Sequence, residues 1–156
     1  MQNNEGMSVA RDRPAQLETQ LCFAVYGAAH AFTRAYKPLL EPLGLTYPQY
    51  LVMLVLWEED GQSVRSLGDR LGLDSGTLSP LLKRLEQAGL VARDRGTEDE
   101  RQVLISLTAR GKDMRSDAAA VNEAIAAALG CGLDEAESLR DGLLALTDRL
   151  ANQPVE

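Results

Sequence analysis

The sequence predicts a mainly α-helical domain that carries one small β-hairpin. Apolar residues repeat at helical spacing over several long segments and alternate one by one only in 102–108. Hydrophobic residues make up 45% of the 156 residues, which is enough for the core of one compact unit. No apolar run approaches the roughly 20 residues of a membrane span, and the polar segment 1–14 lacks the apolar core of a signal peptide. We therefore expect a soluble cytoplasmic protein without a membrane partner.

The first predicted helix covers 17–40. It should end near Lys37-Pro38, because proline has no N–H to donate and disfavours helix in the residue before it. Residues 39–45 are expected to form a connector. Thr46 is a typical N-cap for a second helix over 47–59, whose residues are almost all apolar, so this helix should lie at the centre of the core.

Two short helices follow, over 63–71 and 75–87, with a tight glycine turn between them. Gly89 is expected to stop the second helix. Pro80 is tolerated only near a helix start, which places the first full turn close to Thr77. The leucines of this helix share one face, so its hydroxyl and cationic side chains should lie on the exposed face.

After Gly89 the apolar residues alternate, and they predict strands over 90–95 and 102–108 with a polar turn at 96–100. A helix, a tight turn, a second helix and a hairpin, in that order, form the layout of a winged helix-turn-helix. This module binds double-stranded DNA. The region is therefore the candidate nucleic-acid interface.

Two more helices are predicted, over 110–129 and 134–150, and a Gly-Cys-Gly break separates them. Asp134 should cap the last helix, and Glu137, three residues later, completes a capping pattern.

The net charge of −7 opposes DNA binding when it is taken over the whole chain, but the charge is unevenly distributed along it. Residues 61–115 carry ten Lys or Arg and eight Asp or Glu, whereas the remainder carries six and fifteen. The positive balance is thus confined to the predicted winged module, which removes much of the objection without itself proving DNA binding.

The chemistry of this module suits DNA. A helix N-terminus presents backbone N–H groups to phosphates, short hydroxyls can hydrogen-bond base edges in the major groove, and cations neutralise phosphates. Arginines beside the hairpin tip suit a minor groove. The alternative interpretation is a solvated helix face beside a charged hairpin. The predicted DNA-binding residues are Ser75, Thr77, Ser79, Lys83, Arg84, Arg93, Arg95 and Arg101.

Three segments resemble one known family. Residues 99–108 resemble the wing signature of the MarR family of transcriptional regulators. Residues 73–86 resemble the recognition helix of its organic hydroperoxide resistance regulators (OhrR), and residues 21–26 resemble their redox-sensing segment. The resemblance implies an intertwined helical homodimer on a palindromic operator in double-stranded DNA. It also implies that Asp99 braces Arg101 across the wing and that Arg101 enters the minor groove.

The resemblance implies a single protomer over 1–156. Segments 15–45 and 109–152 would supply the dimerisation helices, and 46–108 would form the DNA-binding lobe.

Cys22 is the candidate sensor, although a lone cysteine in an apolar helix is commonly an inert small hydrophobe. Tyr26 lies one turn later on the same face and can touch it. Tyr36 lies about 21 Å further along the helix, so it can approach Cys22 only from an antiparallel partner, where Tyr47 would join it. Phenols that donate to a thiolate lower its pKa. The resemblance implies a sensor with tyrosines from both protomers, whereas plain core or interface packing is the other interpretation of these tyrosines.

Cys131, between two glycines, is either a harmless loop cysteine or a resolving thiol. The resemblance to two-cysteine family members implies that oxidised Cys22 condenses with Cys131 of the partner subunit.

The predicted function is a repressor that releases its operator when an organic hydroperoxide oxidises Cys22, and that controls the gene of a hydroperoxide-reducing enzyme. We expect no enzyme activity and no cofactor, and a chain with two cysteines and one histidine favours no metal site. Three alternatives remain: a MarR-type repressor released by a phenolic or lipophilic ligand, a thiol peroxidase, and a purely structural helical dimer.

Overall fold

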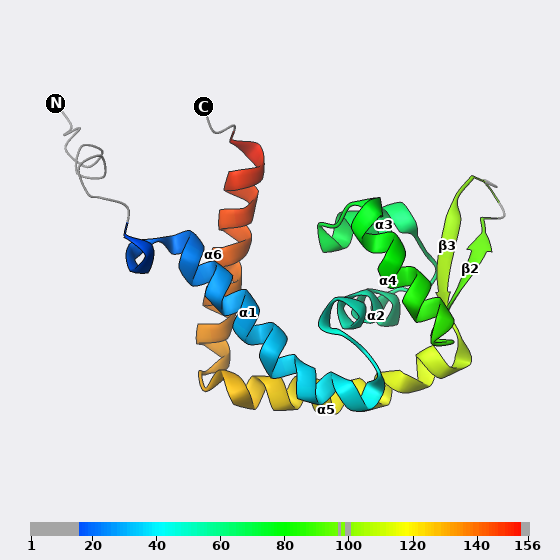
Figure 1. Ribbon diagram of the computed structural model, residues 1–156, viewed down its shortest axis with the longest axis horizontal. Helices are drawn as coiled ribbons and strands as arrows, with labels where there is room; N and C mark the ends of the chain where they lie inside the picture. Colours follow the sequence, from blue (N-terminus) through cyan, green and yellow to red (C-terminus); the bar gives the residue numbers. More distant parts are fainter. Residues whose placement is uncertain (1–15, 97, 99–100, 154–156) are drawn as a thin grey trace.

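The structure is a computed structural model that describes residues 16–96, 98 and 101–153. A compact lobe of short helices and a small sheet lies at one end, and three long helices extend away from it (Figure 1). The mainly helical winged fold expected from the sequence is confirmed. The helices are α1 Leu21–Leu40, α2 Tyr47–Glu58, α3 Val64–Leu71, α4 Ser75–Gln87, α5 Ala109–Leu129 and α6 Leu133–Asn152. The strands are β1 Gln62–Ser63, β2 Val91–Arg95 and β3 Val103–Leu107.

The first helix differs from its prediction at both ends. Leu17–Thr19 form a separate 3-10 turn, and α1 begins only at Leu21. At its other end α1 runs through Pro38 to Leu40 rather than stopping before the proline, and a second 3-10 turn, Glu41–Leu43, follows. Pro38 forgoes one hydrogen bond, worth about 1 kcal/mol net. Burial of Leu40, which is 0% exposed, contributes about 2 kcal/mol and outweighs that loss.

The second helix confirms its prediction. The Thr46 hydroxyl accepts a hydrogen bond from the Gln49 N–H, and the Gln49 side chain accepts one from the Thr46 N–H, which together make a capping box. Most of α2 is buried, so it forms the centre of the core against α1, α4 and α5. Its buried residues are Gln49, Tyr50, Val52, Met53, Val55, Leu56 and Trp57.

The helix-turn-helix is formed by α3 and α4. Gly72 turns the chain with a left-handed φ of +64°, and the Asp74 carboxylate accepts a hydrogen bond from the Thr77 N–H at 2.7 Å. This cap starts α4 at Ser75, so the predicted range 75–87 is confirmed and Thr77 lies in the first turn, while Pro80 lies inside the helix beyond that turn. Burial of the leucine face of α4 holds the helix together although Pro80 donates no hydrogen bond.

The sheet has three antiparallel strands in the order β1-β3-β2 instead of the two of a simple hairpin. Ile105 of β3 pairs with Gln62 of β1 on one side and with Arg93 of β2 on the other. Strand β1 is not predictable from the sequence, because its two residues show no alternation of apolar and polar side chains.

The last two helices meet at Gly130, whose φ is +65°. The predicted cap of the last helix is wrong, because α6 starts at Leu133 with Gly132 as its N-cap and no side-chain cap. Asp134 and Glu135 lie in its first turn, where a negative charge favours the helix dipole.

The chain leaves two helical surfaces uncovered. None of the residues of α6 is buried, and the N-terminal half of α1 has only exposed residues. The N-terminal half of α1 and helix α6 lie together at the end of the molecule away from the lobe (Figure 1). Within the described residues, no single helix is long and apolar enough to cross a membrane, and one pair, 21–43 with 47–58, reaches that length only with a 70° bend. The most exposed large apolar side chains are Leu21 62%, Tyr26 62%, Leu133 74%, Leu139 59% and Leu150 65%.

Candidate DNA interface and cysteine site

The outer face of α4 carries the predicted DNA-reading side chains. The face toward the core is closed by Leu78, Leu82 and Leu85, which are each at most 1% exposed. The opposite face therefore points to solvent, as predicted. Its exposed residues are Ser75, Thr77, Ser79, Lys83 and Arg84.

One of the backbone N–H groups at the N-terminus of α4 already donates to the Asp74 carboxylate. The hydrogen bond from the Thr77 N–H, followed by that from the Thr77 side chain, holds the pKa of Asp74 below its ordinary value. Asp74 is therefore negative at neutral pH and uses one of the N–H groups that we expected to be open to a phosphate. The hydroxyl side chains of the outer face and Lys83 remain accessible to DNA.

The hairpin of β2 and β3 is the wing of the fold, and its arginines do not all lie in the same environment. Arg95 and Arg101 are exposed near the tip of β2 and β3, as predicted. Arg93 instead lies against α4, where its Nε is 3.2 Å from a Glu86 carboxylate oxygen and its guanidinium donates to the Ser79 carbonyl at 3.5 Å. Arg93 thus ties the wing to the recognition helix. Asp99, the predicted brace of Arg101, lies outside the described residues.

A cluster of three tyrosines lies where α1 meets α2. The ring of Tyr36 stacks on Tyr47 with centroids 4.6 Å apart, and its centroid is 5.5 Å from that of Tyr50. Burial, followed by the neighbouring Tyr47 and Tyr50, raises the pKa of Tyr36 to about 12, and burial also raises that of Tyr47. These phenols therefore keep their protons, and their capacity to donate hydrogen bonds, at physiological pH.

Tyr50 belongs to this cluster, and the sequence analysis did not single it out. Its hydroxyl donates to the Asn122 Oδ1 at 2.7 Å. Its position in an otherwise apolar run is the sequence signal that could have identified it, because a buried phenol requires a hydrogen-bond partner elsewhere in the fold.

The two predicted cysteines lie far from the tyrosine cluster along the chain. Cys22 is exposed near the free end of α1, and the neighbouring Tyr26 packs its ring against His30 at 4.3 Å. Tyr36 lies 14 residues further on, about 21 Å along the axis, so one chain does not bring it to Cys22. Cys131 is half-buried at the junction of α5 and α6.

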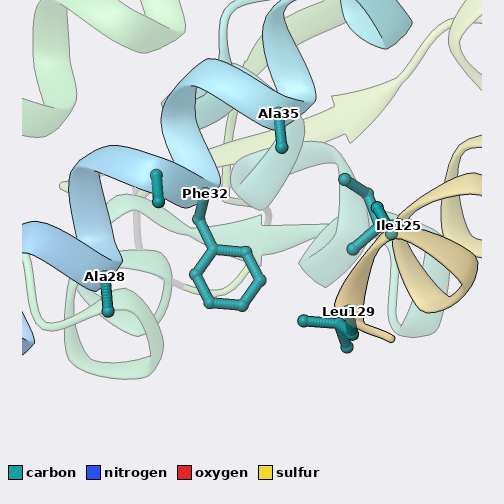
Figure 2. A pocket seen from close by; sticks show the side chains of 7 residues that line it. Ala28, Phe32, Ala35, Ile125 and Leu129 are labelled. Atoms are coloured by element: carbon teal, nitrogen blue, oxygen red, sulfur yellow. The ribbon is translucent and has the colours of Figure 1, made fainter. Parts of the chain in front are cut away.

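An apolar pocket of about 260 Å³ lies between α1 and α5, and Figure 2 shows Phe32 at its centre facing Ile125 and Leu129. All of its lining side chains are apolar, so the pocket has no polar group that would orient a ligand. Among the described residues, no three His, Cys, Asp or Glu side chains are grouped so that they could hold a metal ion.

Comparisons with known proteins agree on the class. Residues 34–117 match the family model described as transcriptional regulator SarA/Rot. The HTH-type transcriptional regulator TtmR of Methylorubrum extorquens is 54% identical over 90% of this chain and 72% of its own length. The organic hydroperoxide resistance transcriptional regulator of Bacillus subtilis is 44% identical over 86% of this chain and 92% of its own length.

Solved structures of AbfR from Staphylococcus epidermidis are also similar. Reduced AbfR bound to DNA has a TM-score of 0.72 at 41% identity, over 88% of this chain and 96% of that chain. Disulfide-formed AbfR has a TM-score of 0.61 at 44% identity, over 84% of this chain and 92% of that chain. The chain therefore belongs to the SarA/Rot family and is a MarR-type winged helix-turn-helix transcriptional regulator of the OhrR kind.

Proposed function

We propose that the protein is a cytoplasmic homodimeric repressor that releases a palindromic DNA operator when an organic hydroperoxide oxidises Cys22. The observation that carries this proposal is the separation, along α1, of an exposed cysteine from the tyrosines that would activate it. An antiparallel pair of α1 helices removes that separation, because the Cys22 end of one chain then lies beside the Tyr36 and Tyr47 end of the other.

The surface of α1 supports this pairing. At 100° per residue, Cys22 and Tyr36 point within about 40° of each other, and Leu40 points in the same direction as Cys22. This face is fully buried at Leu40 but bare at Cys22 and Tyr26. A second copy of the chain would cover the exposed N-terminal half of α1, as the lobe covers its C-terminal end in one chain. Segments 15–45 and 109–152 then supply the dimer interface, and 46–108 forms each DNA-binding lobe.

The proposed chemistry balances. The Cys22 thiolate, stabilised by phenols of Tyr36 and Tyr47 of the partner subunit and by its own Tyr26, attacks the distal oxygen of the hydroperoxide. The O–O bond breaks, the alkoxide takes a proton and leaves as the alcohol, and Cys22 becomes a sulfenic acid. The Cys131 thiol of the partner subunit then attacks this sulfur, which forms a disulfide and releases water.

Oxidation is proposed to act on DNA by geometry. The reduced dimer holds its two α4 helices one DNA turn apart, about 34 to 36 Å. Ser75, Thr77 and Ser79 face base edges, and a polar or covalently tied group at the packed α1 interface rotates the lobes out of register. The remaining proposed DNA contacts are Lys83, Arg84, Arg95 and Arg101, with Arg93 as a further contact or as the tie between wing and helix.

The names of the relatives agree with this proposal. The Bacillus subtilis relative is an organic hydroperoxide resistance regulator, and AbfR is described as reduced on DNA, as overoxidized on DNA and in a disulfide form, which favours the disulfide as the releasing form. By the same reasoning the regulated gene would encode a hydroperoxide-reducing enzyme.

The test is DNA binding before and after peroxide. The DNA upstream of the protein's own gene is titrated with reduced protein and again after one equivalent of cumene hydroperoxide. We expect release by the wild type, tight binding without release by Cys22→Ser, and, on non-reducing electrophoresis, a crosslinked dimer that Cys131→Ser lacks. Release of Cys22→Ser by the peroxide would contradict the redox proposal, and an uncrosslinked but released wild type would contradict the role of Cys131.

One alternative retains a supporting observation. The apolar pocket of Figure 2 suits a lipophilic ligand, and such a regulator would release DNA without cysteine chemistry. In that case Cys22→Ser would respond to an added lipophilic compound as the wild type does, and neither would respond to the hydroperoxide.

A further inference from the structure

The DNA-binding lobe is attached to α5 by two aromatic side chains of α2. The Trp57 Nε1–H donates to the Gly111 carbonyl at 2.8 Å near the start of α5, and the Tyr50 hydroxyl donates to the Asn122 Oδ1 at 2.7 Å farther along it. The two rings contact each other edge to face, with centroids 6.2 Å apart.

Two anchor points determine an angle, whereas one does not. Tyr50 and Trp57 are about two turns apart on α2, and Gly111 and Asn122 are about three turns apart on α5. With both bonds made, α2 is held to α5 at two points. With the Tyr50 bond broken, the Trp57 bond at the base of α5 is the one of this pair that remains.

The two anchors differ in their surroundings. The Trp57 bond is buried, and Gly111 lies so close to Leu90 that the helix start is held by backbone packing as well. Asn122 is on the exposed side of α5, so the Tyr50 bond is the one that water can replace. Tyr50 is also the anchor whose ring contacts Tyr36, the residue that stacks on Tyr47.

We propose that the Tyr50–Asn122 hydrogen bond is the joint through which the tyrosine cluster sets the angle of the DNA-binding lobe on α5. This inference rests on the proposed function. When oxidation at the dimer interface displaces Tyr36, Tyr50 follows the ring it packs against, its hydroxyl leaves Asn122, and the lobe turns about the Trp57–Gly111 bond. Tyr50 and Asn122 are thus positioning residues that contact neither DNA nor peroxide.

The experiment measures the ratio of the DNA dissociation constants of the oxidised and reduced full-length protein, with the loss of free Cys22 thiol followed in the same samples. Tyr50→Phe keeps the ring and removes the hydroxyl, and Asn122→Leu removes the acceptor. Asn122→Asp keeps an acceptor oxygen and serves as the rescue variant, and Glu123→Ala is the matched control for an exposed residue on α5. Circular dichroism establishes that each variant is folded at the assay temperature.

We expect Tyr50→Phe and Asn122→Leu to lose Cys22 thiol to cumene hydroperoxide at the wild-type rate while their oxidised-to-reduced ratio falls at least about fivefold. Asn122→Asp and Glu123→Ala should keep the wild-type ratio. An unchanged ratio in both Tyr50→Phe and Asn122→Leu overturns this inference and leaves the proposed function standing. A wild-type ratio of one after Cys22 is oxidised overturns the proposed function, and the inference with it.

Discussion

In the tyrosine cluster, the half-buried Tyr36 has a raised pKa that bears on both its proposed chemistry and the stability of the fold. Burial, with Tyr47 and Tyr50 nearby, raises the pKa of Tyr36 to about 12 from 10.0. A phenol that keeps its proton is a hydrogen-bond donor, which is the property that stabilisation of a partner's thiolate requires. The same environment makes ionisation of Tyr36 unfavourable to the folded state.

The first prediction concerns alkaline pH. Because the folded pKa of Tyr36 lies above the unfolded value, its contribution to stability is complete below pH 10 and is lost as pH rises toward about 12. Urea unfolding followed by circular dichroism should therefore show a steep fall in the wild-type free energy of unfolding over this range. Tyr36→Phe, which has no proton to lose, should show a shallower fall, and equal slopes in the two proteins would contradict this assignment.

The second prediction concerns Gly111. A Cβ there would lie 2.1 Å from the Leu90 carbonyl oxygen, and because both atoms belong to ordered backbone, α5 or the start of β2 must shift. We expect Gly111→Ala to lower the free energy of unfolding by about 1 to 3 kcal/mol in urea denaturation. Gly142→Ala is the control, since nothing lies within 4 Å of a Cβ on that helical glycine. It should be neutral or stabilising by up to about 1 kcal/mol, and equal losses in both variants would refute the steric explanation.

Among the elements, helix α4 is held to its neighbours by side-chain contacts in addition to the packing of its leucine face. Arg93 pairs with Glu86 of α4, and the Arg110 guanidinium donates to the Ala88 carbonyl at the end of that helix. The β-strand and the start of α5 therefore hold the recognition helix from two sides. Lys83, on the exposed face, is placed for a phosphate contact.

The third prediction separates these roles by their salt dependence. Lys83→Ala should weaken DNA binding uniformly over sequences and reduce the slope of log K against log salt by about one per protomer, because one phosphate contact is lost. Arg93→Gln should weaken binding with a smaller change in slope if its main partner is Glu86. Arg149→Ala on α6 is the control for removal of a cation and should change neither quantity. A slope unchanged by Lys83→Ala would exclude its phosphate contact.

At the scale of the whole molecule, the lobe is complete in one chain but the long helices are not. The core of α2, α4 and the sheet is closed, whereas α6 exposes leucines along its length and α1 exposes its cysteine-bearing half. A monomer rarely exposes so much contiguous apolar surface. These helices are consequently the proposed dimer interface.

The fourth prediction tests that interface. The double variant Leu139→Glu, Leu143→Glu places two charges on exposed apolar positions of α6, which should shift the particle from twice the chain mass toward the chain mass in sedimentation velocity. It should bind DNA at least about tenfold more weakly, since a single lobe contacts only one half-site. Ser138→Glu, also on α6, should remain dimeric. A double variant that keeps the wild-type mass would contradict a dimer interface on α6.

Local sequence signals predicted most of the elements. The N-cap Thr46, the glycine turn before α4, the leucines of α4 and the alternation in 102–108 act within a few residues, so their structural outcome is readable along the chain. The predictions failed where distant contacts decide. Pro38 stays in a helix because Leu40 is buried against the lobe, and β1 exists only because β3 pairs with it.

The sequence by itself determined the winged helix-turn-helix and the family, because these depend on short-range spacing and local motifs. Only the tertiary structure showed that Arg93 is paired with α4 and that Tyr50 joins Tyr36 to Asn122. Such contacts link residues up to 72 positions apart, and their formation depends on how whole helices pack, which no local pattern encodes.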